Sequence, residues 1–203
     1  MIPNGYSVLA PGKIASVVTY LEMLARPPLP DVSSSGSLSN QVQLRQVQNP
    51  ALEWYRALYR RVGAQWMWFS RLEMSDEQLA AVLHRPTTEL FLCEREGSEI
   101  GFAELGRSQP QPPDVEIASF ALLPEETGKG LGRPFMTQLL DRAWSNSAAR
   151  VWLHTCTLDA PAALSFYIKC GFRPYKRAIE VADDPRLRGI LPENAAPQVP
   201  IIR

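Results

Sequence analysis

The 203-residue sequence is poor in cysteine and histidine and has no excess of either charge. Its three cysteines, Cys93, Cys156 and Cys170, are widely spaced, which excludes a disulfide framework and the paired spacing of a zinc site. With 21 basic and 21 acidic side chains the formal net charge is zero, which argues against electrostatic binding to nucleic acid or to an anionic membrane. We therefore expect no metal, no nucleic-acid partner and a reducing, cytoplasmic setting.

Long apolar runs are also missing. No stretch approaches the ~20 consecutive apolar residues that a membrane span needs. The first 30 residues lack a basic start followed by an uninterrupted apolar stretch, so we expect neither a signal peptide nor a membrane partner. Hydrophobic residues still make up 45% of the chain, enough for a sizeable core. Whether the protein forms a homodimer is left open.

Proline and serine mark the ends of the predicted domain. Residues 26–40 read RPPLPDVSSSGSLSN, which is typical of an exposed linker, and residues 184–203 contain Pro185, Pro192, Pro197 and Pro200. We predict an N-terminal extension and linker over residues 1–40, a domain over 41–183 and an irregular tail over 184–203. Residues 14–23 are β-branched enough to form a strand, with a short helix as the alternative.

Between residues 41 and 183, alternating and β-branched runs predict strands, and apolar residues three and four apart predict helices. Ser75, with Gln78 three residues on, predicts a capping box for a helix that Pro86 ends. The predicted strands outnumber the helices and come partly as hairpins and partly as β-α-β units. The fold class is therefore α/β (α+β), with a mixed sheet and helices on its faces.

A glycine-rich run, TGKGLGRPF, occupies residues 127–135, after a predicted strand and before a predicted helix. Glycine lets the backbone approach a phosphate closely, and the first amides of a helix have no partners within it. Those amides and the positive end of the helix dipole favour an anion, and Lys129 and Arg133 add charge. The run predicts a site for a phosphate-bearing ligand.

Two familiar phosphate loops do not fit this run. A Walker A loop needs a serine or threonine directly after its Gly-Lys pair, where Gly130 stands here, and this run also lacks the loop's first glycine upstream. In a Rossmann fingerprint that starts at Gly130, the third glycine is replaced by Phe135, and no acidic residue ends the next predicted strand. Both nucleotide-binding alternatives are therefore disfavoured.

The pattern R/Q-x-x-G-x-G/A fits better, with Thr127 in the first position and Gly130 and Gly132 as its glycines. It resembles the coenzyme A loop of the GNAT superfamily of acyl-CoA-dependent N-acyltransferases. A second stretch, AALSFYIKCGF at residues 162–172, resembles a later helix of that family. The resemblance is close over residues 90–180 and looser over 41–90. At the family's frequent asparagine this chain has Ala160, and we predict that Asp159 caps the following helix instead.

The resemblance implies a mostly antiparallel twisted sheet with helices on both faces and a splayed central strand pair. It also implies an N-acetyltransferase that moves an acetyl group from acetyl-CoA, as co-substrate, to a primary amine of a small molecule or peptide by direct attack. The alternative is a catalytically silent acyl-CoA sensor or interaction module of the same fold. The coenzyme-binding residues implied are Leu122, Leu123, Gly128, Lys129, Gly130, Leu131, Gly132 and Arg133.

Two catalytic residues follow from the same resemblance. Tyr167 stands where the family usually places the tyrosine that protonates the leaving thiolate. Glu116 is the leading base, on the strand that flanks the thioester, and Glu104 is its rival. By strict alternation Glu116 shares a face with Ala118, Phe120 and Leu122, although the family's bulge in this strand would break that count.

The remaining histidines and one cysteine show weaker signals for a functional role. His154 and Cys156 lie two residues apart on a predicted strand, too far for a reliable hydrogen bond, so a nucleophile–base pair is disfavoured and a core or slot-lining role is favoured. His84, beside a predicted helix end, is expected at the surface. The aromatic residues of 54–69 are expected mainly in the core, with one or two of them against substrate.

Overall fold

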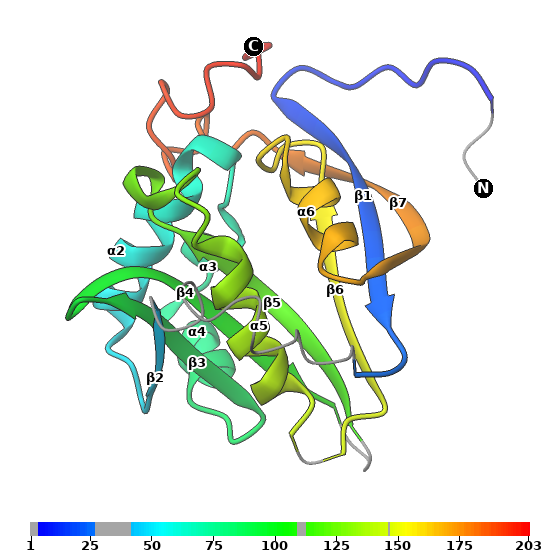
Figure 1. Ribbon diagram of the computed structural model, residues 1–203. Helices are drawn as coiled ribbons and strands as arrows, with labels where there is room; N and C mark the ends of the chain where they lie inside the picture. Colours follow the sequence, from blue (N-terminus) through cyan, green and yellow to red (C-terminus); the bar gives the residue numbers. More distant parts are fainter. Residues whose placement is uncertain (1–3, 27–41, 109–112, 146) are drawn as a thin grey trace.

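The computed structural model describes residues 4–26, 42–108, 113–145 and 147–203 (Figure 1). Within them lies a seven-stranded sheet in the order β2-β3-β4-β5-β6-β1-β7, antiparallel throughout except for the parallel pair β5–β6. The strands are β1 Lys13–Met23, β2 Gln43–Val47, β3 Thr88–Arg95, β4 Ser98–Arg107, β5 Asp114–Leu122, β6 Arg150–Cys156 and β7 Arg173–Asp183. The predicted fold class, with its mixed and mostly antiparallel sheet, is confirmed.

Helices cover both faces of the sheet (Figure 1). One face carries α5 (Gly132–Ala143) and α6 (Ala163–Lys169), and its core joins α5 to strands β4, β5, β6 and β1. The opposite face carries α2 (Leu52–Gly63), α4 (Asp76–Leu83) and the short α3 (Ser70–Glu73), around a second core that includes Tyr55 and Phe102. Two 3-10 turns, η2 (Ala64–Trp66) and η3 (Pro124–Glu126), complete the elements.

Local sequence signals account for several of these boundaries. The side chain of Ser75 accepts a hydrogen bond from the amide of Gln78, and the side-chain oxygen of Gln78 accepts one from the amide of Ser75, so the predicted capping box of α4 is present. The hairpin β3–β4 turns at Glu96 and Gly97, both with positive φ. No helix in the described ranges is long and apolar enough to cross a membrane.

The strand predicted at residues 14–23 is present, but it lies inside the domain rather than in an extension. Residues 13–23 form β1, which lies inside the sheet and pairs with both β6 and β7. Its buried side chains Leu21 and Met23 belong to the core that α5 covers. Residues 1–40 are therefore not wholly an extension outside the domain, because one of the sheet's inner strands comes from them. Most of the predicted linker, residues 27–40, lies outside the described residues.

Residues 184–203 contain no helix or strand, but they cover part of the sheet. Leu191, Ala195 and Ala196 form a third apolar cluster with Ile14 of β1 and Met67. The segment is fixed by buried Arg186, whose guanidinium pairs with Asp184 and donates to three backbone carbonyls in 195–199. The tail therefore stabilises the side of the sheet on which α2 and α3 lie.

The two central strands separate part of the way along. β5 and β6 pair only from Asp114 to Glu116 and from Arg150 to Trp152, although both strands continue for several residues. Next to this point β5 has an irregularity, because Glu104 of β4 faces Ser119 while Leu105 faces Ile117, which leaves Ala118 as an extra residue. The predicted splayed pair of central strands is thus present.

Candidate active site

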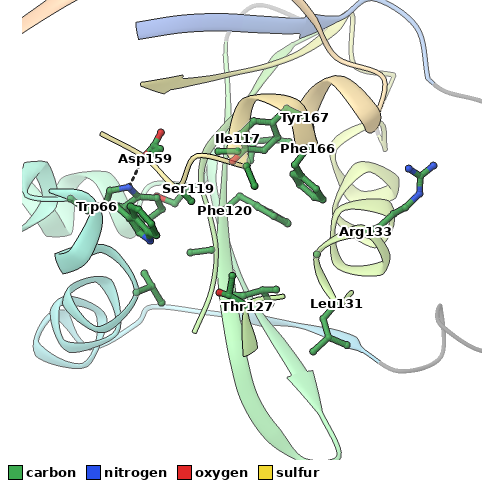
Figure 2. A pocket seen from close by; sticks show the side chains of 18 of the residues that line it. Trp66, Ile117, Ser119, Phe120, Thr127, Leu131, Arg133, Asp159, Phe166 and Tyr167 are labelled. Atoms are coloured by element: carbon green, nitrogen blue, oxygen red, sulfur yellow. Dashed lines mark hydrogen bonds between the residues drawn. The ribbon is translucent and has the colours of Figure 1, made fainter. Parts of the chain in front are cut away.

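A cavity of about 410 Å³ lies where β5 and β6 separate. Its walls are residues 117–122 of β5, the loop 127–133 except Lys129, and residues at and before α6. Val62, Trp66 and Trp68 close it on the side of α2. Figure 2 shows Trp66 and Asp159 at one side of the cavity and Leu131 and Arg133 at the opposite side. The cavity therefore joins the two faces of the sheet.

The glycine run forms one end of this cavity. Gly128 and Gly130 have φ of 83° and 79°, a left-handed conformation that favours glycine, and a Cβ added at either would meet nothing within 4 Å. The open space beside this backbone and the adjoining N-terminus of α5 suit an oxyanion, because amides there lack partners within the helix. Gly132 packs against Phe166, where an added Cβ would come within 3.3 Å of the ring.

The two cations of the run already have partners. The ammonium of Lys129 lies 3.0 Å from a carboxylate oxygen of Glu126, and Lys129 does not line the cavity. Arg133 does line it, and its guanidinium donates to the carbonyl of Lys169 at the end of α6. An anion bound here would therefore meet backbone amides first, with Arg133 at the rim and Lys129 further out.

The wall formed by β5 has a different face pattern from the one that strict alternation predicts. The extra residue Ala118 places Ser119 on the face of Glu104, whereas Phe120 and Leu122 pack in the core on the opposite face. Glu116 faces Gly106 of β4 and so shares the side of Glu104. Glu116 therefore does not share a face with Phe120 and Leu122, because the bulge implied by the family resemblance is present and breaks the strict alternation.

The two leucines at the end of β5 differ in environment. Leu122 lines the cavity, but Leu123 is 3% exposed and packs in the core beneath α2. The amide of Leu123 donates to the carbonyl of Ile100, and its carbonyl accepts from the amide of Glu126 and the hydroxyl of Thr127. The backbone amide and carbonyl of Leu123 therefore already have partners within the protein. Of the two leucines, only Leu122 has access to a ligand in the cavity.

Tyr167 lies in the cavity wall within a group of aromatic rings. Its ring contacts those of Phe120, Phe166 and Phe172 edge to face, with centroids 5.5 to 6.4 Å apart. Burial, followed by the nearby carboxylate of Asp159, raises the pKa of Tyr167 well above its ordinary value. No described residue forms a hydrogen bond to its hydroxyl, which therefore stays protonated and available to a ligand.

Glu104, the rival base, is locked inside the protein. Its side chain is 1% exposed and accepts hydrogen bonds from the hydroxyls of Tyr55 at 2.6 Å and Ser119 at 2.7 Å, and from Arg71 at 3.2 Å. Burial and the adjacent Glu104 raise the pKa of Tyr55, so the phenol remains a donor. This carboxylate ties α2 and α3 to the bulged part of β5, and it does not line the cavity.

Glu116 does not line the cavity either. Burial raises the pKa of its carboxyl group above the ordinary 4.5, and His154, Arg71 and Arg85 partly oppose this effect. His154 does line the cavity. The glycine loop, Leu122 and Tyr167 are thus brought together at one cavity. Glu116 is not among the residues that line it.

Asp159 has a role that the sequence did not predict. It does not cap α6, whose N-cap residue is Ala162. Instead, its carboxylate accepts hydrogen bonds from Thr155 at 2.6 Å, from the amide of Cys156 at 2.9 Å and from the indole of Trp68 at 2.9 Å. The chain after β6 turns back here, so the carboxylate faces the strand it has just left. A local helix-start pattern could not have shown this contact with Trp68.

The sequence matches the model of the Acetyltransferase (GNAT) family over residues 49–172, more than half of the chain. The protein therefore belongs to the GNAT acetyltransferase family, and the resemblance seen in its two motifs is confirmed. No curated protein sequence matches it.

Solved structures show the same fold at low sequence identity. A conserved protein of unknown function from Staphylococcus epidermidis matches with a TM-score of 0.55 and 13% identity over 85% of this chain, which spans only 64% of that protein. An aminoglycoside acetyltransferase from an uncultured soil metagenomic sample has a TM-score of 0.54 and 17% identity, over 66% of this chain and 90% of that one. A spermidine/spermine N-acetyltransferase from Vibrio cholerae has a TM-score of 0.53 and 20% identity, covering 75% and 98%.

Proposed function

We propose that the protein is an N-acetyltransferase that transfers the acetyl group of acetyl-CoA to a primary amine by direct attack in a ternary complex. One observation carries this proposal. The cavity at the separation of β5 and β6 has a glycine-lined anion cradle at one end and the hydroxyl of Tyr167 in its wall. Membership of the GNAT family supports the same reaction class.

The residues of the cavity suit coenzyme A. The amides of residues 128–132, with Arg133 and the more distant Lys129, would hold the diphosphate, and the main chain of Leu122 would lie along the pantetheine arm. Leu131 is buried in the core and fixes the start of α5 beneath the cradle. Bound there, acetyl-CoA would supply the acetyl group as a thioester.

Two side chains would handle the protons. An amine arrives mostly as an ammonium ion and must lose a proton before it attacks, and Glu116 would be the final acceptor of that proton. Tyr167 would give its proton to the departing thiolate and regain one from the acylated nitrogen. The raised pKa of Tyr167 keeps its hydroxyl protonated before the thiolate leaves.

The acceptor is proposed to be an amine of a small molecule or a peptide. The aminoglycoside and polyamine acetyltransferases that share the fold agree with the first of these. The test is thiol release from acetyl-CoA with a panel of amines, amino-acid derivatives and peptides, next to calorimetry with acetyl-CoA alone. Heat of binding without thiol release for any amine would favour the silent acyl-CoA sensor, and absence of both would reject the proposal.

A further inference from the structure

The proposed proton acceptor, Glu116, has no direct access to the cavity, whereas His154 does. Glu116 pairs with Trp152 in the short parallel ladder, and His154 follows two residues later on the same face of β6. His154 therefore lies two residues beyond the strand partner of Glu116, where β5 and β6 separate. We propose that His154 is a catalytic residue that takes the proton from the acceptor amine and passes it to Glu116, a role that rests on the proposed function.

The position of the imidazole is set by its neighbour on the next strand. Tyr20 of β1 pairs with His154 in the antiparallel β1–β6 ladder, and the two ring centroids lie 5.6 Å apart. Lys176 of β7 places its ammonium 4.6 Å from the centroid of the Tyr20 ring. The Tyr20 ring therefore supports His154 on one side, and the side chain of His154 remains exposed toward the cavity.

Charged groups of both signs surround this pair. Glu116 supplies a negative charge from β5, and Asp159 adds a second carboxylate in the cavity wall. Arg71 and Arg85 contribute positive charge near Glu116, and Glu104 contributes negative charge. A carboxylate behind an imidazole stabilises the imidazolium that forms when the amine gives up its proton.

The proton balance of the step is complete. Neutral His154 accepts one proton from the ammonium, which frees the nitrogen lone pair. As the nitrogen–carbon bond forms and the carbon–sulfur bond breaks, Tyr167 gives its proton to the sulfur and regains one from the nitrogen. The imidazolium then passes its proton to Glu116 and on to solvent, so an ammonium and a thioester become an amide, a thiol and one released proton.

The chain offers a matched control, because its only other histidine is His84. His84 follows α4, and its Nε2 atom lies 3.1 Å from the carbonyl oxygen of Pro50, outside the cavity. The experiment measures thiol release with the best amine for wild type, His154→Ala, His154→Gln and His84→Ala, with and without added imidazole. Calorimetry with acetyl-CoA and thermal melting accompany each variant.

Both His154 variants should lose about 100-fold in turnover, the scale of a general base, with unchanged affinity for acetyl-CoA and unchanged melting. Added imidazole should restore turnover to His154→Ala, where it has room, but not to His154→Gln. Wild-type turnover in either variant, or a loss in His154→Ala that imidazole does not relieve, overturns the role of His154 while leaving the proposed function intact. Absence of thiol release by the wild type is the separate failure of the proposed function.

Discussion

The carboxylate of Asp159 lies 2.9 Å from the indole Nε1 of Trp68 and so joins the loop after β6 to the turn between α2 and α3. Both segments contribute residues to the same side of the cavity wall. Trp68 fits against the helix end only because residue 63 is glycine, since a Cβ there would lie 2.3 Å from that of Trp68. One hydrogen bond and one glycine therefore hold these two segments together at the cavity wall.

Replacing Asp159 with alanine should destabilise the protein. The change leaves the donors of Trp68, Thr155 and Cys156 without their acceptor, so we expect the free energy of unfolding to fall by about 3 kcal/mol. Urea denaturation measures it. The control is Asp141→Ala, which removes an exposed ion pair with Arg26 and should cost less than about 1 kcal/mol. Equal effects of the two changes would refute the role of Asp159.

The glycine cradle can be tested with two glycines of equal geometry. Gly130 and Gly97 both have φ of +79°, and neither would meet another atom within 4 Å as alanine. Each substitution should therefore cost about 1 kcal/mol of backbone strain. Only Gly130→Ala adds a methyl group to the cavity wall, and it should weaken acetyl-CoA binding about tenfold, or about 1.4 kcal/mol, by calorimetry. Similar affinities in both variants would argue against a diphosphate site at this loop.

Much of the fold could be predicted because its signals are local. The capping box at Ser75 and the strand–glycine–helix order around Gly130 depend on neighbours in the chain, and both are present. The membership of β1 in the sheet could not be predicted. Its partners β6 and β7 lie more than 120 residues away, and the proline- and serine-rich stretch after it is typical of a domain boundary.

In the candidate site, too, local motifs could be predicted and contacts between distant parts of the chain could not. The motifs placed Leu122, the glycines and Tyr167 at one cavity, because these residues lie on a continuous strand–loop–helix and on the helix beside it. His154 lines the cavity, as the slot-lining interpretation expected. The predicted role of Asp159 was wrong because its partner Trp68 comes from a distant part of the chain. The face of Phe120 follows from the bulge that the family resemblance implied, since alternation alone does not show where one extra residue inverts the faces.

Replacing Tyr167 with phenylalanine should separate chemistry from binding. The ring keeps its contacts with Phe120, Phe166 and Phe172, so melting and acetyl-CoA affinity should not change. Turnover should fall by about 100-fold, because the hydroxyl is the proposed proton donor to the thiolate. Steady-state kinetics and calorimetry on the same preparation check both statements. Unchanged turnover would remove Tyr167 from the mechanism.

Glu116→Gln should change stability in a direction that depends on pH. Burial raises the pKa of Glu116 above 4.5, so its ionisation is harder in the folded protein than in the unfolded chain. The free energy of unfolding of the wild type therefore falls as pH rises from below 4.5 through the folded-state pKa. Glutamine cannot ionise, so the variant should melt at a higher temperature than the wild type at pH 7, with the difference vanishing below pH 4.5.

Glu77→Gln provides a control of opposite sign. A hydrogen bond from Ser75 lowers the pKa of Glu77, whose ionised form is stabilised in the folded protein. That contribution is present above the ordinary pKa of 4.5 and is lost as pH falls through the lower folded-state pKa, so this variant should melt below the wild type at pH 7 and converge with it in acid. Thermal melts across the acid range compare the two. If the Glu116→Gln variant is less stable than the wild type at neutral pH, favourable charges stabilise the ionised Glu116 carboxylate more than burial destabilises it. Glu116 would then be a poor proton acceptor for His154.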